Sequence, residues 1–171
     1  ILKTFFRKYQ ERYLNGADNA VLNPGIVLER LNAALLDEDL EKHVTMFYGV
    51  LTISRNVLRF ANGGQFPSPF LWSGHGFELL QESGTAVGLF PFAVYETFEK
   101  RLPSAFLLAV FSGGVPDVLP QAGLHRKLGC RESLGSGASI QRFMSVVKTN
   151  ADPPDDVTVL TVKKEAAHHG S

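Results

Sequence analysis

Apolar residues near the start of the chain recur three and four positions apart, the spacing that places side chains on one face of a helix. This first stripe comprises Leu2, Phe5, Phe6, Tyr9 and Tyr13. Asn15 and Gly16 follow it, and both residue types tolerate the left-handed conformation common after a helix. A second helix is predicted to begin at Asn23 and Pro24, as N-cap and first helical residue. Its apolar stripe is Val27, Leu28, Leu31 and Leu35.

Beyond His43 the pattern changes to β-branched and aromatic residues with short turns between them, which is typical of hairpins. The first hairpin is predicted to pair Thr45–Ile53 with Val57–Ala61. A second is predicted to pair Phe70–Trp72 with Phe77–Leu80 across a glycine-containing turn.

The remaining segments complete an α+β pattern. Tyr95–Leu102 alternates like a strand, and Ala105–Phe111 is apolar throughout, so we expect it at the centre of a sheet with both faces covered. Ser139–Lys148 is predicted to be a helix, and Val157–Lys163 a last strand. Helices before and after a long run of strands favour an α+β domain with a largely antiparallel sheet. We predict a single domain over residues 1–165, followed by a partly vector-derived tail over residues 166–171.

Composition narrows the classes of function. The 171 residues include 17 Lys and Arg against 17 Asp and Glu, so no basic excess is present to bind a nucleic-acid backbone. The longest apolar runs are too short to span a bilayer. A single cysteine permits no internal disulfide, and a reducing, cytoplasmic setting is the simplest expectation. The chain starts at Ile1 inside a predicted helix, so we expect that an upstream segment has been removed.

Three polar or glycine-rich segments are candidates for function. Asp152–Asp156 places carboxylates at the entrance of the last strand, where they suit Mg²⁺ or Mn²⁺ but also suit a solvated loop. Phe111–Val115 contains a glycine turn after a buried strand, which is frequent at functional sites and equally explained by backbone geometry. For the glycines of Ala61–Pro67, a loop between two strands, backbone geometry is the leading explanation. No phosphate-loop, dinucleotide or zinc-helix motif is complete, and no catalytic residue is predicted.

Five segments in order resemble the bacterial PPM-type protein serine/threonine phosphatases of the SpoIIE/RsbU group. They correspond to the family's TLFYGVLD, LRYANAGHPP, GLPLGL, LLYTDGV and PDDITLL. In this chain they are Thr45–Leu51, Leu58–Pro67, Gly84–Leu89, Ala109–Val115 and Pro154–Leu160. The likeness extends from about Pro24 to Lys164, and Leu119–Gly123 is similar to the output domain of RssB-like response regulators.

The resemblance implies an α-β-β-α sandwich of mainly antiparallel sheets and hydrolysis of phosphoserine or phosphothreonine on a protein. It also implies two Mn²⁺ or Mg²⁺ ions held by aspartates. It assigns metal binding to Asp155 and Asp156, and an active-site loop to Asn62, Gly63, Gly64 and Gln65.

The chain departs from the family pattern at three points. Gly113 stands where the family has a metal-binding aspartate, and glycine has no side chain to ligate a metal. Gln65 replaces the usual histidine. The family's first strands, with further aspartates, would lie upstream of Ile1, so the domain is expected to lack them.

Two main hypotheses follow for the function. The chain is either the output domain of a two-component response regulator with phosphatase activity in stress sigma-factor control, or a degenerate pseudophosphatase that serves as a protein-binding adaptor. A purely structural output domain is a third alternative. The expected partner is a protein, either a phosphorylated anti-sigma-factor antagonist or a sigma factor, and neither nucleic acid nor a membrane. The first helix could pack on the core or against a second copy, with core packing as the default.

Overall fold

A computed structural model gives the fold of the chain in two compact units. The residues that it describes are 2–38, 42–73, 76–112 and 158–165. Backbone contacts assign Ile1–Gln65 and Glu82–Leu102 to the first unit, and Phe66–Gln81 and Pro103–Ser171 to the second. The single domain expected over residues 1–165 stays a prediction, and each unit is described by itself.

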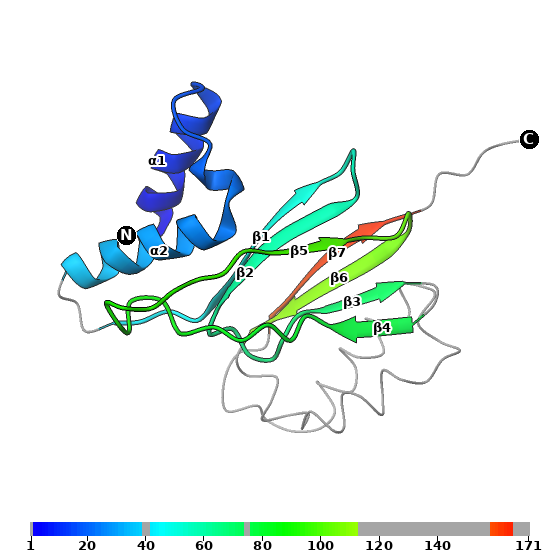
Figure 1. The fold of residues 1–171 in the computed structure, drawn as a ribbon. Helices are drawn as coiled ribbons and strands as arrows, with labels where there is room; N and C mark the ends of the chain where they lie inside the picture. The colour runs from blue at the N-terminus through cyan, green and yellow to red at the C-terminus, as the bar shows by residue number, and fades with distance from the viewer. Residues whose placement is uncertain (1, 39–41, 74–75, 113–157, 166–171) are drawn as a thin grey trace, which may run out of the picture. The chain divides into compact units, whose positions relative to one another are not determined.

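The first unit begins with the two helices that the sequence predicts (Figure 1). Helix α1 spans Leu2–Leu14 and ends where Gly16 takes a positive φ of 68°. A short 3-10 helix, η1 (Ala20–Leu22), leads into α2 (Pro24–Asp37). The Asn23 side chain caps α2 by accepting from the Ile26 amide at 3.5 Å, which confirms the predicted start.

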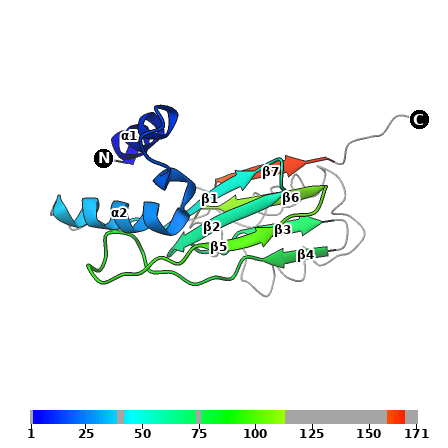
Figure 2. The same ribbon diagram turned by 45° about the horizontal axis from the view of Figure 1, so that its top comes forward.

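The sheet of the first unit has the order β1-β2-β5, from strands β1 (Met46–Thr52), β2 (Val57–Gly63) and β5 (Phe98–Arg101). All its pairs are antiparallel, so the first predicted hairpin is confirmed (Figures 1 and 2).

The strand predicted over Tyr95–Leu102 is too long, because only its last part pairs with β2. Before that point, Thr97 Oγ1 accepts from the Gly25 amide and donates to Asn23 Oδ1, both at 2.8 Å. This segment therefore braces the start of α2 instead of extending the sheet.

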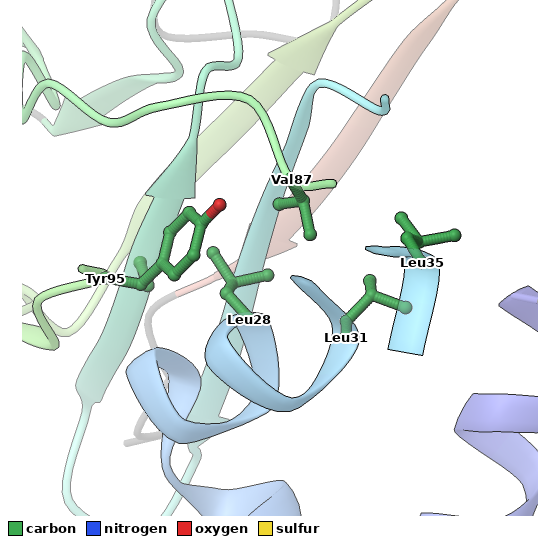
Figure 3. Close-up of a cluster of buried hydrophobic side chains, with 6 residues drawn as sticks. Leu28, Leu31, Leu35, Val87 and Tyr95 are labelled. Carbon is green, nitrogen blue, oxygen red and sulfur yellow. The ribbon is translucent and has the colours of Figure 1, made fainter. Parts of the chain in front are cut away.

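The core of the first unit lies where α2 packs on the sheet. Figure 3 shows the leucines of α2 facing Val87 and Tyr95, which come from the long connection between β4 and β5. The buried cluster contains Leu28, Leu31, Leu35, Ala61, Val87 and Tyr95.

Helix α1 contacts this core through the first part of its apolar stripe. Phe5 and Phe6 pack against the cluster, and Phe6 stacks on Tyr48 with 5.7 Å between ring centroids. Tyr13, at the far end of the same stripe, is 41% exposed. Core packing of the first helix is thus confirmed for Phe5 and Phe6, although no residue of α1 is fully buried.

The second unit contains a four-stranded antiparallel sheet of order β4-β3-β6-β7. Its strands are β3 (Phe70–Ser73), β4 (Gly76–Leu79), β6 (Phe106–Phe111) and β7 (Val159–Lys164). The second hairpin and the central place of β6 are confirmed, although Leu107 and Val110 are only half-buried. The helix predicted over Ser139–Lys148 lies outside the described residues. Among the residues that are described, no helix is long and apolar enough to cross a membrane.

A buried polar side chain, Asn32 on α2, holds the connection over residues 86–95 to the core. Its Oδ1 accepts from the Gly88 amide at 2.7 Å and from the Tyr95 hydroxyl at 3.2 Å, and its Nδ2 donates to the Phe90 carbonyl at 3.0 Å. The Tyr95 hydroxyl also lies 3.2 Å from the Ala86 carbonyl, so its one proton is shared between two acceptors. Burial raises the pKa of this hydroxyl. Asn32 therefore satisfies backbone groups that lack partners in a helix or sheet.

Replacing Asn32 by leucine should lower the free energy of unfolding by about 3 kcal/mol, because it leaves the Gly88 amide without a partner at the edge of the core. The Phe90 carbonyl also loses one of its two donors and keeps only the Ala93 amide. Tyr95→Phe should cost only about 1 kcal/mol, since Asn32 keeps its backbone partners. Urea denaturation measures both values, with exposed Asn19→Leu as the matched control. A loss for Asn32→Leu no larger than that of the control would contradict the anchoring role.

Candidate functional site

The predicted active-site loop lies at the end of β2. Asn62 and Gly63 are the last residues of the strand, and Gly64 and Gln65 follow it. Gly64 has a positive φ of 76°, so a glycine is required there for backbone geometry, which was one of the two explanations left open by the sequence. The predicted metal ligands Asp155 and Asp156, and Gly113 at the missing aspartate, lie outside the described residues.

Asn62 organises this loop through hydrogen bonds. Its Oδ1 accepts from the Gln65 amide at 2.7 Å, and its Nδ2 donates to the Glu82 carbonyl at 2.7 Å and the Gln65 carbonyl at 3.4 Å. The residue is only 7% exposed. Because both ends of the amide are engaged with backbone, Asn62 is a positioning residue for Gln65 and Glu82 and not a group available to a substrate.

Glycines allow the segment over residues 82–87 to lie directly against the loop. A Cβ added at Gly84 would overlap the Asn62 carbonyl group, and one at Gly64 would come within 2.8 Å of the Ala86 amide nitrogen. Val87 also bridges to Val44, with an amide-to-carbonyl distance of 2.8 Å in each direction. Two segments that the resemblance singled out separately, Leu58–Pro67 and Gly84–Leu89, are thus brought together at one place.

Glu82 is a residue at this place that sequence reasoning missed. Its carbonyl is the acceptor for Asn62, and its carboxylate Oε2 is inaccessible to solvent and has no hydrogen-bond partner among the described residues. A buried carboxylate oxygen without a partner costs free energy, so Glu82 is a candidate binding group of this site. In the sequence, Glu82 is distinguished only by its position two residues before Gly84, and no general motif marks that position as functional.

The described part of this site does not by itself form a metal centre. No group of three or more His, Cys, Asp or Glu side chains comes together within the described ranges. The described residues supply a tight turn, a Gln65 whose backbone amide is bound by Asn62, and one buried carboxylate oxygen of Glu82. Asp155 and Asp156 lie outside these ranges, so their role as metal ligands stays a prediction.

Comparison with known proteins identifies relatives over nearly the whole chain. The family model described as Stage II sporulation protein E (SpoIIE) matches residues 1–165. A search of curated proteins finds no match.

Solved phosphatase domains share the fold at low sequence identity. The SiaA PP2C domain of Pseudomonas aeruginosa is 18% identical with a TM-score of 0.66, and the match covers 84% of this chain and 62% of that domain. The phosphatase domain of SpoIIE from Bacillus subtilis is 15% identical with a TM-score of 0.63, and the match covers 98% of this chain and 76% of that one. The S. agalactiae serine/threonine phosphatase is 13% identical with a TM-score of 0.57, over 82% and 68% of the two chains. These matches confirm the predicted α+β fold of the PP2C type.

Asn62→Ala should destabilise the chain by about 3 kcal/mol, because the Gln65 amide and the Glu82 carbonyl both lose a buried partner. Amide exchange at Gln65 should accelerate more than exchange in the middle of β2. Asn15→Ala, at an exposed position after α1, is the matched control and should change little. Unchanged exchange at Gln65 in Asn62→Ala would show that something other than Asn62 holds the loop.

Proposed function

This chain belongs to the Stage II sporulation protein E (SpoIIE) family, and from that membership we propose that its protein hydrolyses phosphoserine or phosphothreonine on a protein substrate. The observation that carries the proposal is the family match over residues 1–165, together with a PP2C-type fold. The chain spans 62% of the SiaA domain, so the activity of the whole protein is part of the proposal.

The residues of this chain would contribute in two ways. Asp155 and Asp156 would hold Mn²⁺ or Mg²⁺, and a SpoIIE phosphatase domain presoaked with Mn is among the structures that share the fold. When bound, such ions supply an activated water and screen the charge of the phosphoryl group. Asn62 keeps Gln65 and Glu82 in fixed positions, so the loop needs little rearrangement when a substrate arrives.

The biological setting of the proposal is a stress-signalling pathway in the cytoplasm. We propose that the chain is the output domain of a two-component response regulator, acting on a phosphorylated anti-sigma-factor antagonist. The support is the likeness of Leu119–Gly123 to RssB-like regulators. The proposed partner is a protein, since the chain has equal numbers of basic and acidic residues, and a homodimer fits the half-exposed stripe of α1.

One observation favours a second function, that of a pseudophosphatase adaptor. Gly113 occupies the position of a family metal-binding aspartate. Without that aspartate, the site lacks an anionic ligand that hard divalent cations need. An adaptor of this kind would bind its partner, a sigma factor or an antagonist, without hydrolysing it.

Phosphate release from a phosphorylated antagonist, measured in the full-length protein with Mn²⁺, separates the two functions. The enzyme should be active, and Asp155→Asn should lower its rate about 100-fold, because the metal would lose an anionic ligand and bind more weakly. Asp37→Asn, at the exposed end of α2, is the matched control and should keep full activity.

Equal activity of Asp155→Asn and the control would refute the role of Asp155. Absence of phosphate release, with partner binding unchanged by a chelator, would refute the enzyme and support the adaptor. Partner binding that a chelator abolishes would count against the adaptor.

A further inference from the structure

A pocket rich in arginine opens on the three-stranded sheet of the first unit. Its volume is about 560 Å³, and its lining is Thr52, Arg55, Val57, Arg59, Glu99 and Arg101. The strand register explains this gathering, because Thr52 pairs with Val57, Val57 with Arg101, and Arg59 with Glu99. Side chains from all three strands and from the β1–β2 turn therefore meet on one face of the sheet.

Backbone hydrogen bonds fix the positions from which the arginines extend. The turn carrying Arg55 is closed by its own amide, which donates to the Thr52 carbonyl at 3.2 Å. The Leu102 amide donates to the Asn56 carbonyl at 2.7 Å and so ties the end of β5 to this turn, next to Arg101. Arg59 donates to the Leu22 carbonyl at 3.1 Å, which uses one of the five N–H groups of its guanidinium.

The charges around the pocket are unbalanced. The lining contains three arginines and one acidic residue, Glu99, so it carries a formal charge of two positive units. Arg55 and Arg101 are exposed, and neither forms an ion pair within the described residues. Like charges that line one pocket repel one another, and a bound anion would relieve their repulsion.

We propose that this pocket binds a phosphate monoester dianion. Such a group carries a charge close to −2 at neutral pH, which matches the formal charge of the lining. Planar guanidinium groups bind phosphate oxygens through pairs of parallel hydrogen bonds, and the Thr52 hydroxyl adds a neutral donor. A volume of about 560 Å³ is larger than one phosphate needs, and it leaves room for the organic group that carries the ester.

This pocket is separate from the loop of the proposed active site. Val57 begins β2 at the pocket, and Asn62 and Gly63 end the strand at the loop. At about 3.3 Å per residue, the two ends of this strand lie roughly 20 Å apart. The inference therefore stands whether or not the proposed phosphatase activity is found.

Isothermal titration of the 171-residue chain with glucose 6-phosphate and with a phosphoserine peptide tests the pocket. Arg101→Gln should weaken binding at least about tenfold, since a charge-assisted pair of hydrogen bonds is lost. Glu99→Gln should strengthen it severalfold, because a repulsive charge is removed. Arg7→Gln removes the same charge from α1, where the side chain is 73% exposed, and should leave affinity unchanged.

Tighter binding of the peptide would identify a phosphoprotein as the source of the ester, and tighter binding of the sugar phosphate a metabolite. No saturable binding of either ligand would overturn the proposal. So would an equal effect of Arg7→Gln and Arg101→Gln, or weaker binding by Glu99→Gln, since each shows that the lining of the pocket does not determine affinity.

Discussion

The architecture of the first unit depends on how a long irregular connection satisfies its backbone polar groups. Residues 82–97 contain no helix or strand, and within the described residues a single bridge at Val87 supplies their only sheet-like pairing. A segment of this kind can lie against a core only if its buried backbone groups find other hydrogen-bond partners, and side chains can provide them. Two buried asparagines do so. Asn32 binds Gly88, Phe90 and Tyr95, and Asn62 binds Glu82.

The same constraint shapes the candidate site. Since Asn62 uses one side-chain amide to hold both Gln65 and Glu82, the end of β2 and the start of the connection form one rigid element. Gly84 and Gly64 permit the close backbone approach that this requires. A site built in this way is preorganised, and it adjoins the core in which Val87 is fully buried among the leucines of α2.

Local patterns in the sequence were enough to predict most of the described helices and strands. They were not enough to predict contacts between residues far apart in the chain. The spacing of Leu28, Leu31 and Leu35 predicts α2, and Asn23 with Pro24 predicts its start, because both signals act within a few residues. The strand at Tyr95 was extended too far, since alternation cannot tell a paired backbone from one held by the side chain of Thr97. The contact of Asn62 with Glu82 and the arginine pocket join residues 20 or more positions apart, where no periodic pattern exists. The metal assignment to Asp155 and Asp156 stays a prediction.

Hydrogen exchange at the Gly88 amide tests most directly whether buried asparagines anchor the connection. The amide donates to Asn32 Oδ1 at 2.7 Å, so we expect protection comparable to that of Phe60 in the middle of β2, despite its place in an irregular segment. In Asn32→Leu this protection should disappear while that of Phe60 persists. Exchange at Gly88 as fast as at exposed Glu96 in the unaltered chain would contradict the account.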